Sequence, residues 1–516
     1  MSTPEERLRD ALGAQDWDAV VAIIGDDWTL LMQGPRETLR VALNALPAEV
    51  LEANARLGVA RDYLNFIPDS GEVRPVRFQH TPTPPAGLLD TLAVLTARTA
   101  SDRFIGAFGH AVDTVREIHS TLADVSDEAL VAVRPVLAEM RVQWAISLLF
   151  GGHLTDALHG FERSYDEALA FGNARMAAES AGSIAFIASL GGDRRERERW
   201  IARMPGLDAA APPDTVGVMG GLAEAVAAID GLDPLAASAA LDRTPGDEMA
   251  PEQWVLRAYV ESRLAAKFGD PRAQLVQLRA AARSHLPALS QSGLNHWLLR
   301  LSEATLLQAA GDLRASAEVA GELRGSRVES AVESGAIVSA WVLARQGEAR
   351  RALAVAGPFL VQADTPRTSV EMLAVTAAAQ LQLGREQDAA ASFTTCLQLA
   401  LHEGLHSVLT HFEGPELEAL SAAAGVGIPP AIGSALERAN RPAAGRPFVA
   451  ALSHREQVVL RLLIDGLSTD QIAQHEHVSR NTIKSQTQSL FRKIEVSSRE
   501  AAVELGLAHP ELWASV

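Results

Sequence analysis

Side chains able to hydrogen-bond to DNA are concentrated between residues 480 and 494, a stretch with four basic residues and no acidic one. At about 100° per residue, its polar members share one arc of a helix: Asn481, Lys484, Ser485, Gln488 and Arg492. The opposite arc carries the residues that would pack: Ile483, Thr487, Leu490 and Ile494. Lysine can donate to guanine O6 and N7, asparagine or glutamine can bridge adenine N6 and N7, and basic groups suit phosphates. The stretch therefore predicts a helix that is anchored on one side and enters a major groove with the other.

A second pattern with possible chemistry is His402-Glu403-Gly404-Leu405-His406, which matches H-E-x-x-H. On a helix, two histidines one turn apart can bind zinc while the glutamate acts as a base. Gly404 weakens the helix that this arrangement needs, and so short a pattern often arises by chance. We predict no metal, no cofactor and no enzymatic activity, and keep a metallohydrolase as a minor alternative.

The elements that would position the 480–494 helix are bounded by capping residues. The expected N-caps are four serines: Ser453, Ser468, Ser479 and Ser498. Glu456 and Gln471 stand three residues after the first two serines and complete capping boxes. Gly466 is expected to close the first helix as its C′ residue. A helix, a glycine turn, a short helix and a longer helix, in this order, are typical of a helix-turn-helix.

This segment resembles the LuxR-type (GerE-like) DNA-binding domain. The matching residues are Leu452-Ser453-His454-Arg455-Glu456, Val459-Leu460, Gly466-Leu467-Ser468, Ile472-Ala473, Val478-Ser479, Thr482-Ile483-Lys484, Arg492-Lys493-Ile494, Val496 and Ser498-Arg499-Glu500-Ala501. The segment departs from the family pattern at Gln486 and at Glu495. The resemblance implies a four-helix domain over residues 448–516 that binds double-stranded DNA, pairs as a homodimer at least on DNA, and regulates transcription.

The resemblance also implies roles for individual residues. Lys484, Ser485 and Gln488 should face the major groove, and Arg480, Thr482 and Arg492 should contact phosphates. The remaining DNA-binding candidates are Asn481, Lys493, Ser468 and Thr469. The fourth helix should supply the dimer contact through four apolar residues: Ala502, Val503, Leu505 and Leu507.

Residues 1–412 show a repeating texture in which a turn glycine separates two Ala-rich amphipathic runs. The turn glycines are Gly152, Gly192, Gly231, Gly269, Gly311, Gly347 and Gly384, separated by 36 to 42 residues. This period predicts pairs of antiparallel helices, slightly longer than the tetratricopeptide unit, stacked into a curved solenoid. An irregular helical domain with chance glycines is the alternative. The predicted fold class is therefore all-α: a tetratricopeptide-like solenoid followed by the helix-turn-helix domain.

The repeat region is loosely similar to the helical-repeat segment of MalT-like regulators. The similarity rests on two phrases: Trp28-Thr29-Leu30-Leu31 through Leu43-Asn44-Ala45-Leu46-Pro47, and Leu397-Gln398-Leu399-Ala400-Leu401 through Phe412-Glu413-Gly414-Pro415-Glu416-Leu417. It would place a sensor in the repeats. The chain has three lysines, Lys267, Lys484 and Lys493, and none follows a glycine, so the phosphate-binding loop of the full-length relatives is excluded.

Composition sets the remaining limits. The net charge is −18, and residues 448–516, with 7 basic and 8 acidic side chains, account for −1 of it. DNA binding should therefore depend on the local basic edge and on pairing two copies, because the acidic remainder repels phosphates. Cys396 is the single cysteine; it fits a reducing cytoplasm and is expected to be a buried small hydrophobe. Neither a secretory signal nor a membrane-spanning run is expected.

We predict three segments: a repeat sensor over residues 1–412, a linker over 413–447, and the DNA-binding domain over 448–516. Within the linker, one more helix can form over 431–438, and residues 440–447 are expected to be a tether. A second tether is expected at 74–85, where prolines cluster. The predicted function is transcription regulation in the cytoplasm, controlled by a ligand or protein bound to the repeats, with a contact to RNA polymerase left open. The alternative is an interaction scaffold whose terminal helices serve pairing.

Overall fold

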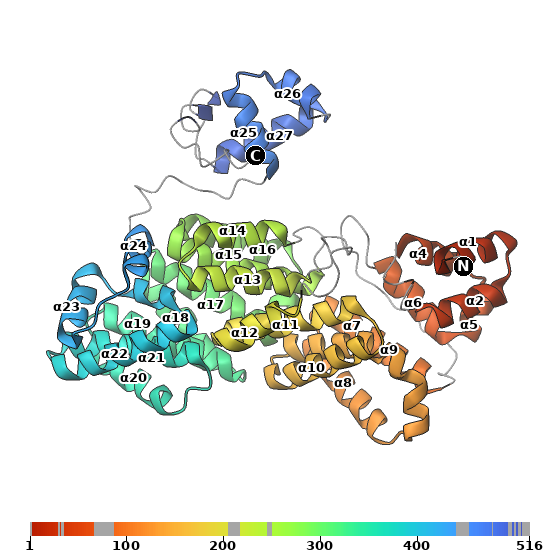
Figure 1. The fold of residues 1–516 in the computed structure, drawn as a ribbon, viewed down its shortest axis with the longest axis horizontal. Coiled ribbons are helices and arrows are strands. Elements are labelled where there is room, and N and C mark those ends of the chain that lie inside the picture. Colours follow the sequence, from red (N-terminus) through yellow and green to blue (C-terminus); the bar gives the residue numbers. More distant parts are fainter. Residues whose placement is uncertain are drawn as a thin grey trace.

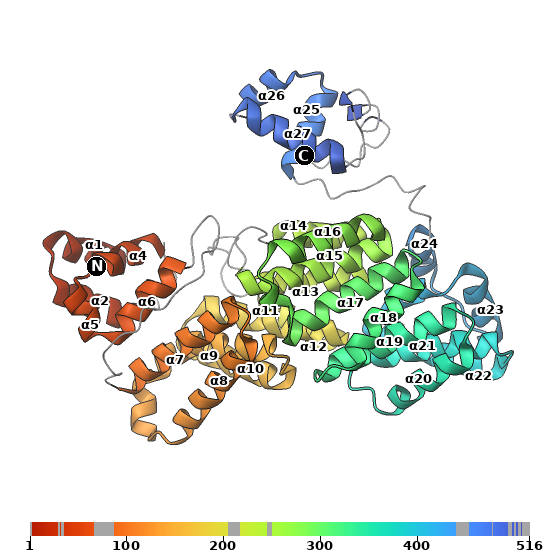
Figure 2. The same cartoon turned by 180° about the vertical axis from the view of Figure 1, so that it is seen from behind.

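The computed structural model describes residues 3–28, 31, 36–66, 87–204, 217–244, 250–439, 454–476, 478–493, 498–499, 502–503 and 507. Within these residues all regular structure is helical and no strand occurs (Figures 1 and 2). The predicted all-α class is confirmed. None of the helices in the described parts combines the length and the apolar character that crossing a bilayer requires. The expected tethers at 74–85 and 440–447 lie outside the described residues.

The first helices enclose a core of their own. They are α1 (Pro4–Ala14), α2 (Trp17–Asp26), α4 (Arg36–Ala45), α5 (Ala48–Ala53) and α6 (Ala55–Phe66). Leu8, Leu39 and Leu64 are fully buried between them. The indole N–H of Trp28 donates to the carboxylate of Glu139 at 2.9 Å, which links this unit to the next part of the chain. Sequence reasoning placed these residues in the repeat region and did not separate their core.

The central part of the chain is a run of antiparallel helix pairs. After α7 (Leu88–Phe104) and α8 (Phe108–Ala123) the pairs are α9 (Asp127–Phe150) with α10 (Leu154–Ala170), α11 (Ala174–Gly191) with α12 (Arg194–Ile201), α13 (Val218–Asp230) with α14 (Pro234–Arg243), α15 (Trp254–Phe268) with α16 (Pro271–Ser284), α17 (Gly293–Ala309) with α18 (Leu313–Arg324), α19 (Glu329–Arg345) with α20 (Ala349–Val361), and α21 (Pro366–Gln382) with α22 (Glu386–Glu403). Each predicted turn glycine lies between the two helices of one pair. That these pairs are of the tetratricopeptide type stays a prediction.

The turns show why glycine recurs at this spacing. Five of the seven glycines adopt positive φ, the left-handed conformation that costs a side chain most: Gly152, Gly192, Gly311, Gly347 and Gly384. Gly231 and Gly269 do not, with φ of −76° and −119°. In the α13–α14 turn the left-handed residue is instead Leu232, with φ 66°. Its side chain is buried in the core, and this packing offsets the backbone strain.

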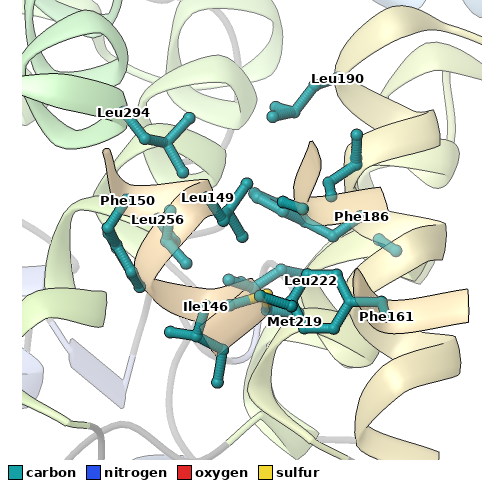
Figure 3. Close-up of a cluster of buried hydrophobic side chains, with 14 of the residues drawn as sticks. Ile146, Leu149, Phe150, Phe161, Phe186, Leu190, Met219, Leu222, Leu256 and Leu294 are labelled. Carbon is teal, nitrogen blue, oxygen red and sulfur yellow. The ribbon is translucent and has the colours of Figure 1, made fainter. Parts of the chain in front are cut away.

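One continuous core runs through the first five pairs. Figure 3 shows leucine, isoleucine and phenylalanine side chains from α9, α10, α11, α13, α15 and α17 meeting in it. Small residues let the helices approach closely, as at Gly182, where an added Cβ would lie 3.0 Å from the backbone nitrogen of Gly220. Ala-rich helices therefore pack here through their backbones as much as through large side chains.

The pairs are followed by two helices within the segment expected to be a linker, 413–447, and the sequence indicated only the second of them, over 431–438. α23 (Gly414–Ala424) and α24 (Pro430–Ala439) are helical, and Leu420 and Leu436 are buried in the core of the last pairs together with Phe393. The glycines and prolines that suggested a linker mark helix ends instead, since Gly425 adopts φ 63° as a C-cap and Pro430 begins α24. The stack therefore extends to residue 439.

Candidate nucleic-acid interface

The C-terminal segment builds a small core from three described helices, α25 (His454–Ile464), α26 (Thr469–His475) and α27 (Arg480–Lys493). Its fully or nearly buried members are Val459, Leu460, Leu462, Leu463, Ile472, Ala473, Ile483, Leu490 and Ala502. Ile483 and Leu490, one full heptad apart on α27, have no exposed surface. Thr487 lies between them with a buried hydroxyl that has no hydrogen-bond partner in the described part of the chain. The predicted packed face is thus formed, while Ile494 lies outside the described residues.

Two of the four predicted serine caps, Ser468 and Ser479, are formed. The Ser468 hydroxyl accepts from the Gln471 N–H at 3.4 Å, and the Gln471 side chain accepts from the Ser468 N–H at 2.8 Å. Gly466 adopts φ 84° and ends the turn after α25. Ser479 caps α27 by accepting from the Thr482 N–H at 3.1 Å. Ser453 lies outside the described residues.

Arg499 fixes the segment that follows α27. Its guanidinium donates to the carbonyl of Leu467 at 2.7 Å and to that of Leu463 at 3.4 Å. It thereby satisfies carbonyl groups at and just after the end of α25, where a cation is electrostatically favoured. Sequence reasoning did not assign this positioning role, because nothing in local spacing connects residue 499 to a turn more than thirty residues earlier.

The exposed edge of α27 carries Arg480, Lys484 and Gln488, whose side chains are exposed. They are spaced four residues apart, so they follow one another along a single face of the helix. Thr482 is half-buried, and its hydroxyl lies 2.7 Å from that of Ser479. The candidates Asn481, Ser485, Arg492 and Lys493 belong to the same helix, but their side chains lie outside the described residues.

The start of α26 lies beside this edge. Ser468 is exposed and Thr469 is half-buried at the N-terminus of that helix. Asp470 forms an ion pair with Arg480 at 2.8 Å, and both side chains are mostly exposed. Sequence reasoning missed this pair, which joins two helices and places a carboxylate next to the basic edge. Because the pair is exposed, little free energy is needed to exchange it for another anion.

The four residues expected to pair two copies have different environments. Ala502 is fully buried in the core of its own domain, so in this conformation a second copy could not touch its side chain. Val503 is partly buried against the same core, and Leu507 is 61% exposed. Leu505 lies outside the described residues. Pairing through Val503, Leu505 and Leu507 stays a prediction.

The H-E-x-x-H pattern does not adopt the geometry that zinc requires. α22 ends at Glu403 because Gly404 takes φ 69°, so His402 and His406 do not share a helix. His402 is 80% exposed, and the Glu403 carboxylate accepts from the Arg194 N–H at 3.1 Å. Over the described residues, no group of three or more potential ligands could hold a metal ion. Cys396 is fully buried, as predicted, and burial raises the pKa of its thiol.

Comparison with known proteins agrees with this geometry. The family model of bacterial regulatory proteins of the luxR family matches residues 450–505. Over 54 residues the chain is 43% identical to the CsgBAC operon transcriptional regulatory protein of Escherichia coli (strain K12), and equally so to the probable csgAB operon transcriptional regulatory protein of Salmonella typhimurium (strain LT2). The match covers 10% of this chain and 25% of each relative. Residues 450–505 are therefore a LuxR-family helix-turn-helix domain, and the resemblance noted in the sequence is confirmed.

Proposed function

From the LuxR-family domain at residues 450–505, we propose that the chain is a sequence-specific DNA-binding regulator of transcription. The observation that carries this proposal is the division of α27, in which Lys484 and Gln488 are exposed while Ile483 and Leu490 are buried. A helix held in this way can enter a major groove without exposing its apolar side. Two relatives over the same segment are named as transcriptional regulatory proteins.

Lys484, Ser485 and Gln488 are assigned to base edges, because lysine and glutamine side chains offer the donors and acceptors that distinguish guanine and adenine. Phosphate contacts are assigned to the other candidates: Arg480, Asn481, Thr482, Arg492, Lys493, Ser468 and Thr469. Arg480 would exchange the carboxylate of Asp470 for a phosphate on binding. The amides at the start of α26 add a favourable partial charge for the same purpose.

Pairing of two copies is part of the proposal. The domain has a net charge of −1 over residues 448–516 and so lacks a general electrostatic attraction to DNA. Two domains joined through Val503, Leu505 and Leu507 would double the base contacts and place two α27 helices about one turn of DNA apart. The relatives named above match this chain over only a quarter of their length, so the assembly of the whole chain remains our proposal.

The repeat stack is proposed as the regulatory part. A ligand or protein bound there would change how the C-terminal domains pair, and the acidic stack would oppose DNA in the unbound state. A contact with RNA polymerase and a cytoplasmic location follow from the same role and belong to the same proposal.

The test is DNA binding by the full chain, measured by fluorescence anisotropy with random duplexes over a range of salt concentrations. We expect the affinity for DNA to fall steeply as the salt concentration rises. Arg480→Ala, which removes a proposed phosphate contact, should weaken binding to random duplexes, whereas Arg314→Ala should not. Arg314 is a suitable control because its side chain is 90% exposed and it belongs to α18, a helix of the repeat stack rather than of the DNA-binding domain. Salt-insensitive binding, or equal loss in both variants, would instead favour an interaction scaffold whose terminal helices serve only pairing.

A further inference from the structure

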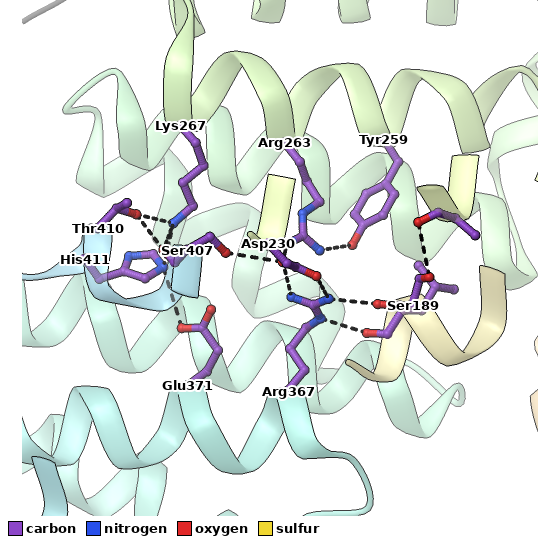
Figure 4. A network of polar contacts seen from close by, with 12 residues as sticks. Ser189, Asp230, Tyr259, Arg263, Lys267, Arg367, Glu371, Ser407, Thr410 and His411 are labelled. Atoms are coloured by element: carbon purple, nitrogen blue, oxygen red, sulfur yellow. Dashed lines mark hydrogen bonds and ion pairs between the residues drawn. The ribbon is translucent and has the colours of Figure 1, made fainter. Parts of the chain in front are cut away.

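The helix pairs curl so that early turns meet late ones around a buried polar network (Figure 4). At its centre the carboxylate of Asp230, at the end of α13, has no exposed surface. It accepts from Arg263 at 2.7 Å and from the guanidinium of Arg367 at 2.7 and 3.0 Å. The Ser407 hydroxyl in η4 (His406–His411) donates to it at 3.2 Å. Asp230 is therefore saturated with donors and already shared by two arginines.

A second carboxylate, that of Glu371, belongs to the same network and is largely buried. Glu371 accepts from the indole of Trp341 at 3.1 Å and lies 3.6 Å from His411 Nε2. Lys267 donates to Thr410 Oγ1 at 2.8 Å and to the carbonyl of Ser407 at 3.2 Å. Burial lowers the pKa of Lys267 to about 8, so the amine remains mostly protonated at neutral pH. Burial also lowers the pKa of His411, so its imidazole is neutral there.

Arg197 adds a cation that the network does not satisfy. Its side chain, on α12, is 4% exposed, and among the described residues its Nε and Nη1 atoms have no hydrogen-bond partner. Two carboxylates act on it electrostatically, Asp230 and Glu198. Asp230 is occupied as described above, and Glu198 binds Arg194 at 2.6 Å. Burial lowers the pKa of Arg197, which expresses the same unmet need for a counter-charge.

The charges around this point do not balance. Five cations, from Arg194, Arg197, Arg263, Lys267 and Arg367, face four carboxylates, from Glu198, Asp230, Glu371 and Glu403, which leaves a surplus of 5 − 4 = 1 positive charge. A buried charge without a partner is strongly unfavourable. Natural interiors therefore rarely keep such a surplus unless an anion completes it.

On its Nη2 side the guanidinium of Arg197 faces Gly404, next to the Arg194 side chain, whose Cδ would lie 3.6 Å from a Cβ added to Gly404. A Cβ added to Gly404 would lie 4.0 Å from Arg197 Nη2, and Gly404 adopts φ 69°, which favours a residue with no side chain. His406, two residues on, is half-buried, and burial, with a smaller contribution from Arg194, lowers its pKa. The turn between α22 and η4 thus presents backbone and a neutral imidazole to Arg197, while the carboxylate of Glu403 is engaged with the Arg194 N–H at 3.1 Å.

We propose that Arg197 anchors a binding site for a small oxyanion, a carboxylate or phosphate group, between α12 and the turn joining α22 to η4. The planar fork of the guanidinium matches the two oxygens of either group. The anion would bridge α12, in the second helix pair, and the end of α22, in the last pair. It would therefore stabilise the contact between these two parts of the stack. If the anion is also the ligand that regulates DNA binding, that part of the inference rests on the proposed function.

The test uses the full chain, with sodium phosphate and sodium citrate as probes and sodium chloride at equal ionic strength as the reference. Isothermal titration calorimetry should show saturable binding of at least one probe, with a matching rise in Tm. Phosphate alone would identify a phosphate site, and citrate alone a carboxylate site. Absence of saturable heat with both probes would overturn the proposal.

Two variants distinguish anion binding at Arg197 from the non-specific stabilisation that salts give to any folded protein. Arg197→Gln should weaken binding at least tenfold, and in chloride it should be as stable as the original chain or more so, because an unpaired charge is removed. Arg199→Gln, from the same helix but 51% exposed, should bind as the original does. Equal responses in both variants would refute the site. Should Arg197→Gln fail to fold, Arg197→Lys, which keeps the charge without the fork, takes its place.

DNA binding is measured separately on the same samples. Loss of the anion response with DNA binding retained in Arg197→Gln supports the site. A chain that binds anions but never DNA would leave the site standing and remove the proposed function.

Discussion

On α27, Lys484 and Gln488 lie one helical turn apart on the exposed edge, while the opposite side of the helix packs against the core of the domain. This division could be predicted from the sequence because helical periodicity alone decides which residues share a face. Ile483 and Leu490 are buried as expected. The ion pair of Arg480 with Asp470 could not be predicted, because it depends on the angle between two helices rather than on spacing within one.

This ion pair makes a prediction at the residue scale. Asp470→Asn removes a carboxylate beside the basic edge and frees Arg480 for phosphate, so affinity for random duplex DNA should rise about two- to fivefold at low salt. The gain should shrink as salt increases, since the competing pair is exposed. Anisotropy titrations at several salt concentrations measure it. Asp10→Asn, an exposed aspartate of α1, should change nothing. Reduced affinity in Asp470→Asn would show that Arg480 does not contact DNA.

At the scale of elements, the glycine period predicted the helix pairs but not the conformation of every turn. The spacing shows where two helices separate. In six of the seven turns the residue with positive φ directly precedes the next N-cap, and Gly269 is the exception, with φ −119°. In the α13–α14 turn the cap is Asp233, so the left-handed position moves to Leu232. The expected linker at 413–447 failed for a related reason. Glycine and proline also occur at helix ends, and only the packing of Leu420 and Leu436 distinguishes the two cases.

Two glycines with similar backbones make a matched prediction about these elements. Gly311 has φ 85°, and no atom lies within 4 Å of an added Cβ. Gly311→Ala should therefore lower the free energy of unfolding only by the backbone strain of a left-handed alanine, about 1–2 kcal/mol. Gly293 has φ 62°, but its added Cβ would lie 1.9 Å from the carbonyl oxygen of Phe150. Gly293→Ala should therefore lower the free energy of unfolding by at least twice as much. Urea unfolding followed by far-UV circular dichroism compares them, and equal losses would mean that the contact between α17 and α9 is not formed.

At the scale of the whole molecule, the fold depends on contacts between residues more than a hundred positions apart. Arg367 reaches Asp230 and the carbonyls of Ser189 and Leu190 at 2.8 and 2.9 Å, across about 180 residues of chain. No sequence pattern marks these partners, because an arginine or aspartate on a helix normally faces solvent. The helix pairs could be predicted, but the contacts that join the early pairs to the late ones could not.

Asp230 should therefore be among the most sensitive positions in the stack. Asp230→Asn leaves the buried cations of Arg263 and Arg367 without their carboxylate, and breaking such a pair costs about 3–5 kcal/mol. Asp10→Asn again serves as the control, with an expected change below about 0.5 kcal/mol. The measurement is urea unfolding at neutral pH. A loss as small as that of the control would show that the network does not hold the curl.

The same network predicts a dependence on pH. The arginines lower the pKa of Asp230 to about 2, although desolvation opposes them. The contribution of the Asp230 carboxylate to the free energy of unfolding is therefore fully present above the pKa of an unfolded aspartate, about 4. It is lost as the pH falls from there towards 2. Glu371, whose pKa is also lowered to about 2, acts in the same direction. Stability measured across this range should fall less steeply in Asp230→Asn, and identical slopes would exclude Asp230 as a source.

Whether α27 reads DNA sequence is tested most directly by selecting bound duplexes from a random pool with the full chain and with Lys484→Ala. The full chain should enrich a common motif with two half-sites about one turn of DNA apart, and Lys484→Ala should lose preference at one position of each half-site. Enrichment of no motif, or of the same motif to the same degree by both proteins, would contradict this prediction.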